Sequence, residues 1–256
     1  MRTSLGMQAI GLAAYALVLI ALGRWPVLSL EQVPYGLVLA IVGALSLAAL
    51  YKSFALGPIA VVSPVVASYA ALTVVLIVIF LGERLLPGQI AAIGVTFVGV
   101  AVASTDIREL RATLGRPSEG VRIGLLATVG FGIWGALFAA AARATDGLAV
   151  IVVQRSFGVV LLALFALARR TSLAPLAPPR LLGLVALVGV LDTGANVLLA
   201  LGIQAGYASF VMTGSGAYPL IPAILAISVL RERLAPNQYI GVAVLIAGLV
   251  ALGLQS

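Results

Sequence analysis

Long apolar stretches, separated by short polar connections, run along the whole chain. Each is close to the roughly 20 residues that an α-helix needs to cross a hydrocarbon core, and none shows the strict alternation typical of barrel strands. Because backbone polar groups that face lipid must be paired within their own segment, we expect helices. The pattern predicts an all-α polytopic membrane protein with nine transmembrane helices. The predicted spans are 5–22, 33–53, 58–81, 88–105, 121–142, 147–168, 180–202, 207–230 and 237–254.

Composition and charge support the same class. Of the 256 residues, 62% are hydrophobic and 9% charged, whereas a soluble domain has about 45–50% apolar and about 25% charged residues. This excludes a soluble enzyme and a secreted module. The net charge of +7 fits basic loops that face the cytoplasm and anionic lipid better than a nucleic-acid surface. We expect a multi-pass protein of the cell membrane, of the bacterial inner-membrane type, with lipid as a partner and no nucleic acid.

Neither cysteine nor histidine occurs in the chain. The commonest general base and metal ligand is therefore missing, together with thiolate chemistry and disulfides. No phosphate-binding loop of the ATPase type is present either. We expect no catalytic residue, no metal site and no cofactor, and we interpret the protein as a non-enzyme.

The chain contains an internal repeat. Residues 81–89 read LGERLLPGQ and residues 230–238 read LRERLAPNQ, with six of nine positions identical at an offset of 149. The same offset pairs Tyr69 with Tyr218. It spans five predicted helices, an odd number, so the two copies cross the membrane in opposite directions. Inverted repeats of this kind are typical of secondary transporters.

The repeat also predicts the domain organisation. Residues 1–105 form the first repeat, 106–120 a cytoplasmic linker, and 121–256 the second repeat. The predicted helix 121–142 has no partner in the first repeat. Either the fold has nine spans, or the first repeat lacks its first helix, which would precede Met1.

Several short motifs stand out, of which the Glu-Arg pair, the glutamine and the tyrosine recur at matching places in the two repeats. The motifs are Gly82-Glu83-Arg84 and Gln89 in the first repeat, and Trp134-Gly135, Arg155, Tyr218-Pro219, Glu232-Arg233, Gln238 and Gly241 in the second. In these motifs the chain resembles the EamA-type permeases of the drug/metabolite transporter superfamily over nearly its whole length. The resemblance implies two inverted five-helix repeats, here without the first Trp-Gly helix, and transport of small metabolites, often amino acids.

Polar residues inside the predicted spans are the candidate substrate contacts. Asp192 lies near the middle of its helix, where a carboxylate costs about 2.5–3.5 kcal/mol and should face a wet cavity or a partner. Asn196 follows one turn later on the same face. The alternative is a structural role, with Asp192 tying its helix to a neighbour. Arg155 can bind a substrate carboxylate, snorkel to the headgroups, or pair with Asp146.

Aromatic residues form a second group of candidates. Tyr69 and Tyr218 lie near prolines that interrupt helical hydrogen bonding, and such segments line the sites of transporters. Ser215 adds a hydroxyl nearby, and Trp134 offers either core packing or a stacking face.

The acidic-basic pairs that follow the two matching helices are interpreted as structural or gate residues. They are Glu83, Arg84, Glu232 and Arg233.

Together these features favour a secondary-type transporter that moves a small polar metabolite by alternating access. Export or import, and proton coupling or facilitated diffusion, stay open, as does the oligomeric state. Two alternatives are a non-transporting membrane partner subunit and an intramembrane lipid-acting enzyme. The second is disfavoured, because paired acid/base groups are missing.

Overall fold

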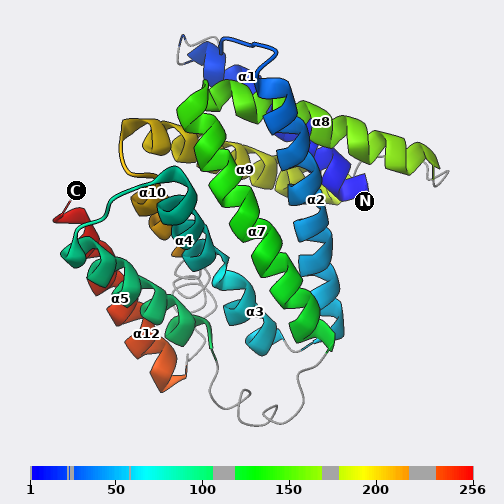
Figure 1. Ribbon diagram of the computed structural model, residues 1–256. Coiled ribbons are helices and arrows are strands. Elements are labelled where there is room, and N and C mark those ends of the chain that lie inside the picture. The colour runs from blue at the N-terminus through cyan, green and yellow to red at the C-terminus, as the bar shows by residue number, and fades with distance from the viewer. Residues whose placement is uncertain are drawn as a thin grey trace. The chain divides into compact units, whose positions relative to one another are not determined.

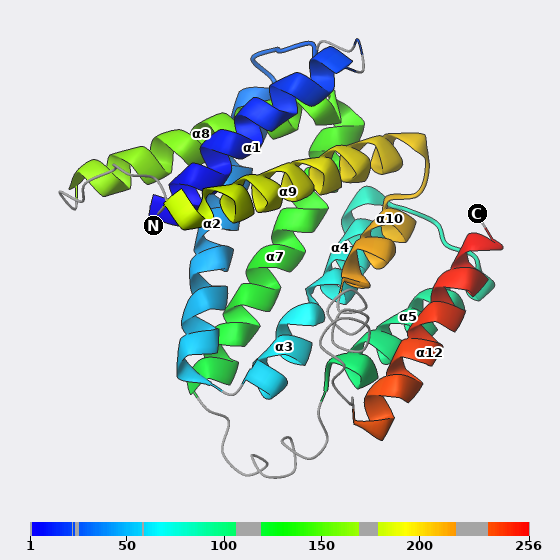
Figure 2. The same ribbon diagram turned by 180° about the vertical axis from the view of Figure 1, so that it is seen from behind.

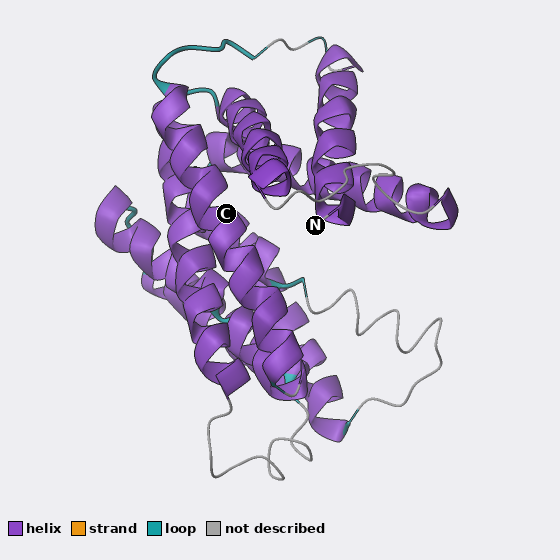
Figure 3. Cartoon of the chain, turned by 90° about the vertical axis from the view of Figure 1, so that its right-hand side faces the viewer, coloured by secondary structure: helices purple, strands orange, loops and turns teal. Residues whose placement is uncertain are grey.

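The structure, a computed structural model, describes residues 2–21, 23, 26–57, 59–105, 119–168, 179–218 and 235–255. Among these residues every regular element is an α-helix (Figure 1, Figure 3). The helices are α1 (Arg2–Ala21), α2 (Gln32–Leu56), α3 (Ile59–Ala67), α4 (Tyr69–Leu81), α5 (Pro87–Ser104), α7 (Glu119–Ala144), α8 (Gly147–Ala168), α9 (Pro179–Ala205), α10 (Ala208–Gly216) and α12 (Pro236–Gly253).

The predicted fold class is confirmed: the chain is a polytopic helical membrane protein. Among the described residues, seven helical segments are long and apolar enough to cross a membrane, and an eighth, Ile10–Ala21, is apolar but shorter. The expected number of nine is not reached. The first expected span qualifies only over that shorter stretch, and of the expected span 207–230 only residues 207–218 are described.

A break interrupts the predicted span 58–81, which the apolar pattern had suggested to be continuous. Helix α3 ends at Ala67 and α4 begins at Tyr69. Pro64 has no N–H to donate, and the Ser68 hydroxyl donates to the Val65 carbonyl at 2.6 Å, so local side chains compete with the regular ladder.

The second repeat ends its helix at the equivalent place. Helix α10 has the bounds of α3 shifted by 149, since it begins at Ala208 and ends at Gly216. Tyr218 precedes a proline, and residues before proline are disfavoured in helical conformation. The two repeats thus share a helix end that their apolar sequence did not reveal.

Repeat-related residues also form matching helix starts. Helix α5 begins at Pro87, and the Gln89 side chain accepts a hydrogen bond from the Leu86 N–H at 2.9 Å. Helix α12 begins at Pro236, and Gln238 accepts from the Ala235 N–H at the same distance. Both use proline where no N–H is needed, together with a side chain that satisfies a free donor.

The repeat partners α5 and α12 run antiparallel and lie side by side (Figure 1, Figure 2). The start of each helix reaches the end of the other: Gln89 Nε2 donates to the Gln255 carbonyl at 3.0 Å, and Asn237 Nδ2 donates to the Thr105 carbonyl at 2.7 Å. Two equivalent helices that run in opposite directions are the arrangement that an inverted repeat requires.

The helices form two compact units, and each contains helices of both repeats. Unit 1 comprises Met1–Ile41 and Leu137–Gly206, and unit 2 comprises Val42–Ala136 and Tyr207–Ser256. In unit 1, α1 packs against α8 and α9. In unit 2, α5 packs against α12, and α10 against α4. Helices α2 and α7 contribute residues to both units.

The end of α4 supplies a first testable prediction. Gly82 follows Leu81 with φ of +66°, a conformation that costs a residue with a Cβ about 1–2 kcal/mol. A Cβ there would meet no atom within 4 Å, so the cost is conformational only. We expect Gly82→Ala to lower the free energy of unfolding by about 1–2 kcal/mol and Gly82→Asn by less, in unfolding titrations in mixed micelles. Equal stability of wild type and Gly82→Ala would contradict this.

Candidate functional site

An ion pair joins α8 to α9 inside unit 1. The Arg155 Nη2 atom lies 2.5 Å from Asp192 Oδ2. The Arg155 side chain is 6% exposed and that of Asp192 is 53% exposed. The guanidinium is therefore buried in an apolar bundle, where a charge needs a partner, and the carboxylate lies at its exposed edge.

This pair corrects one of the alternatives drawn from sequence, in which Arg155 paired with Asp146. The Asp146 carboxylate instead accepts the Leu148 N–H at 2.9 Å, at the start of α8, and the Val27 N–H at 3.4 Å. Asp146 acts there as a helix cap, because its side chain satisfies a donor that the first turn leaves free.

Helix α1 lies against α8 and α9 (Figure 2) and contributes a residue beside the guanidinium. A Cβ on Gly11 would lie 2.5 Å from Arg155 Nη1, so this glycine leaves the space that the guanidinium fills. The buried Thr193 hydroxyl lies 3.0 Å from the Gly11 carbonyl and thereby links α9 to α1. Sequence reasoning missed Gly11 and Thr193, because nothing in the sequence indicates that α1 packs against α8 and α9.

Asn196 lies beside Asp192, as its spacing of one helical turn predicts. Its Nδ2 atom donates to the Asp192 backbone carbonyl at 2.7 Å and lies 3.4 Å from Asp192 Oδ1. Together, Arg155 and Asn196 orient the Asp192 carboxylate. The three polar residues predicted in this part of the chain thus form one cluster, which has both a positive and a negative group.

A second cluster, in unit 2, is aromatic. The Tyr69 and Tyr218 rings have centroids 6.5 Å apart and planes inclined by 26°. Phe131 lies on α7, with its ring centroid 5.7 Å from that of Tyr69. The Ser215 side chain lies near that of Tyr69. The repeat-related tyrosines and Ser215 therefore meet, and Tyr218 remains 41% exposed.

Trp134 packs within unit 2 against a glycine of α2. A Cβ on Gly43 would lie 3.3 Å from both Cδ1 and Nε1 of the indole. Gly43 is the repeat partner of Asp192, so the equivalent positions of the two repeats carry different chemistry. The adjacent Gly135 brings α7 close to α4, since a Cβ there would lie 2.7 Å from Thr73 Oγ1.

Of the predicted gate residues, the structure describes two. Glu83 is 7% exposed, and its two carboxylate oxygens accept the N–H groups of Ala208 at 3.1 Å and Ser209 at 3.0 Å. Arg84 is exposed. Glu232 and Arg233 lie outside the described residues.

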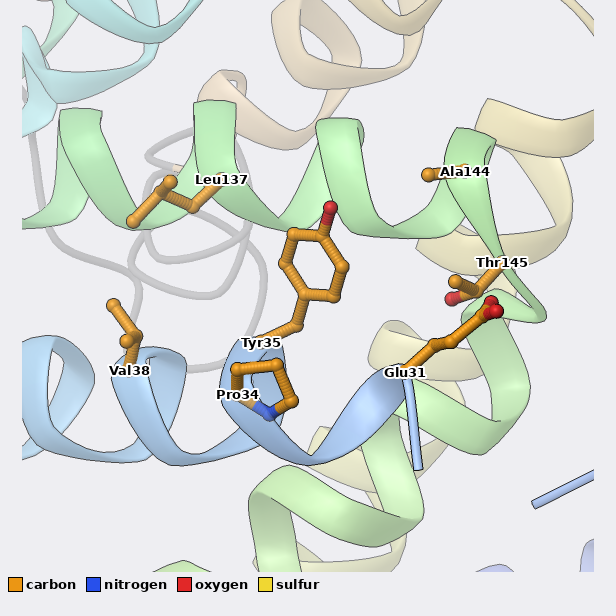
Figure 4. A pocket seen from close by; sticks show the side chains of 7 residues that line it. All are labelled: Glu31, Pro34, Tyr35, Val38, Leu137, Ala144 and Thr145. Carbon is orange, nitrogen blue, oxygen red and sulfur yellow. The ribbon is translucent and has the colours of Figure 1, made fainter. Parts of the chain in front are cut away.

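A pocket of about 620 Å³ in unit 1 was not foreseen (Figure 4). The ring of Tyr35 points from α2 toward α7, and the Glu31 and Thr145 side chains lie close together at one end. The pocket is lined by Glu31, Pro34, Tyr35, Val38, Leu137, Ala144 and Thr145. None of the substrate contacts predicted from sequence lines it. In the part of the chain that is described, no group of three acidic side chains is placed to hold a metal ion.

Comparison with known proteins adds the family context. The sequence model of the EamA-like transporter family matches residues 118–254, more than half of the chain. One similar solved structure, titled only as the crystal structure of a protein, superposes with a TM-score of 0.73 at 19% identity. The match covers 100% of this chain and 88% of the other, and it shows a shared fold. No curated protein matches the chain significantly.

Proposed function

Because the chain belongs to the EamA-like transporter family, we propose that it carries a small polar metabolite, such as an amino acid, across the cell membrane by alternating access. The observation that carries the proposal is the Arg155–Asp192 pair, at 2.5 Å, within an apolar helix bundle. Charged side chains inside membrane segments are costly and mark substrate or ion pathways. The antiparallel pairing of repeat-related helices supports alternating access. In transporters built from inverted repeats, one repeat or bundle moves against the other and so opens the site to each side of the membrane in turn.

The two clusters supply different contacts in this proposal. Arg155, Asp192 and Asn196 offer a cation, an anion and an amide, which suit the charged groups of a metabolite. Tyr69, Tyr218 and Trp134, in unit 2, offer ring faces, and Ser215 a hydroxyl; we propose them as a separate candidate set of contacts, which suits a less polar substrate group. Asp192 is half exposed and is the side chain that we propose for carrying a proton, if transport is coupled.

The first test is transport itself. Purified protein is screened for thermal stabilisation by individual proteinogenic amino acids, and a stabilising compound is then offered in labelled form to proteoliposomes preloaded with the unlabelled compound. We expect counterflow that empty liposomes do not show. Absence of counterflow with every compound would favour a non-transporting partner subunit, and turnover of the surrounding lipid would favour an enzyme.

Asp192→Asn tests the polar cluster in the same assay. Hydrogen bonds to charged groups are worth about 1.5–3 kcal/mol, so we expect transport to fall by about 10- to 100-fold. Glu119→Gln is the matched control, because this carboxylate is exposed in the first turn of α7, and it should transport at the wild-type rate. If Asp192→Asn retains transport with its full pH dependence, Asp192 is not the proton carrier.

A further inference from the structure

Glu83 joins two antiparallel helices of unit 2. It follows the end of α4, and its carboxylate accepts N–H groups from the first two residues of α10, Ala208 and Ser209. At the opposite ends, Tyr69 begins α4 and stacks on Tyr218, two residues beyond the end of α10. The two helices therefore meet at both ends, with the carboxylate at one and the stacked tyrosines at the other.

The cap that Glu83 provides comes from a distant part of the chain. The residue that precedes α10, Tyr207, makes no side-chain capping bond. The free N–H groups at a helix start carry a partial positive charge, so a carboxylate is their most favourable acceptor. Both oxygens of Glu83 are used, and the side chain is 7% exposed, so water competes little for these bonds.

Because α10 is short, the cap at its start also limits where its other end, next to Tyr218, can lie. Its nine residues span about 14 Å as a rigid element. Gly216, at its end, packs closely on α4, since a Cβ there would lie 2.5 Å from the Ala70 Cβ. A displacement at the capped start of so short a helix therefore reaches its other end.

We propose that Glu83 is a positioning residue, whose carboxylate sets where α10 lies along α4 and thereby holds Tyr218 against Tyr69. This role goes beyond the proposed function, because it concerns how the two tyrosines are held together and does not depend on whether they contact a substrate. Its test needs no substrate, so failure of the transport assay and failure of this inference are separate results.

The experiment compares Glu83→Ala and Glu83→Gln with wild type by two measurements. Hydrogen exchange reports on residues 207–216. Fluorine NMR of protein labelled with 3-fluorotyrosine reports on Tyr218, whose resonance is assigned by Tyr218→Phe. In Glu83→Ala we expect exchange at the start of α10 to be roughly 5- to 30-fold faster, as for a lost helix cap, and the Tyr218 resonance to shift. Glu83→Gln should change both less, because its amide oxygen still accepts one N–H.

Gln89→Ala is the matched control. It removes the side-chain acceptor at the start of α5, where Gln89 accepts the Leu86 N–H. We expect faster exchange in the first turn of α5 and an unmoved Tyr218 resonance. If Tyr218 keeps its resonance in Glu83→Ala, or moves equally in Gln89→Ala, the inference is overturned. Should Glu83→Ala fail to fold, Glu83→Gln decides: a Tyr218 shift supports the positioning role, and an unmoved resonance refutes it.

Discussion

Gly99→Ala is expected to lower the free energy of unfolding by about 2–3 kcal/mol, at the upper end of the usual cost of overpacking. A Cβ on Gly99 would lie 2.5 Å from Leu245 Cα and 2.8 Å from Leu245 Cβ, on the facing helix α12. Backbone atoms cannot rotate away as a side-chain end can, so α5 and α12 must separate. Small residues at helix contacts in membranes allow the close packing that this substitution removes. Unfolding titrations in mixed micelles measure the effect.

The same helix offers its own control. Gly94 also lies in α5, but a Cβ there would meet no atom within 4 Å. Gly94→Ala should leave stability unchanged or raise it by at most about 1 kcal/mol, because alanine favours helix more than glycine does. Gly248→Ala, at the repeat-equivalent position, should resemble Gly99→Ala, since its Cβ would lie 2.6 Å from the Thr96 backbone nitrogen. Equal stabilities of the Gly94 and Gly99 variants would show that α5 and α12 do not pack as described.

Asp192→Ala is expected to destabilise the protein by about 2 kcal/mol, because it takes the carboxylate away from the buried Arg155 guanidinium. Breaking a fully buried pair costs about 3–5 kcal/mol. The Asp192 side chain is 53% exposed, so part of that cost is screened. Asp192→Asn should cost less, since the amide oxygen still accepts a hydrogen bond from the guanidinium. The same titrations compare both variants with wild type.

Replacing both members of the pair separates charge from packing. Buried ion pairs can be exchanged for apolar residues of similar volume with little loss of stability. We therefore expect Arg155→Met combined with Asp192→Leu to lie within about 1 kcal/mol of wild type, although it should not transport. A double variant as unstable as Asp192→Ala would show that the loss comes from packing around Gly11 and Thr193 rather than from the charge.

The clusters show how far sequence reasoning reached. The offset of 149 matched Tyr69 with Tyr218 as equivalent positions of the repeat, whereas only the structure showed that their rings stack. Asn196 beside Asp192 followed from helical periodicity. The partner of Arg155 did not follow. Asp146 is nearer in sequence, whereas Asp192 lies 37 residues away, and the rotation of α8 and α9 about their axes decides between them.

Hydropathy did not reveal the end of α10 or its cap, although the nearby prolines indicated interrupted helical hydrogen bonding. An apolar run of about 20 residues is long enough to span the hydrocarbon core whether or not its helix is interrupted. Hydropathy therefore could not reveal the break at Ser68. The cap of α10 comes from Glu83, 125 residues away from Ala208. A charged residue after a helix is common at membrane surfaces, and nothing local to Glu83 indicates which helix start it reaches.

Sequence alone determined the class of fold, most of the helix bounds to within a few residues, the inverted repeat and helix starts within one residue of Pro87 and Pro236. These depend on the local length of apolar runs, on the missing N–H of proline and on repetition within the chain. Tertiary structure decided the Arg155–Asp192 pair, the cap of α10 by Glu83 and the fit of Gly99 against Leu245. These contacts depend on how each helix is rotated about its axis and how closely it approaches its neighbour. The apolar pattern of the sequence does not fix that rotation, because lipid tails and aliphatic side chains are similarly apolar.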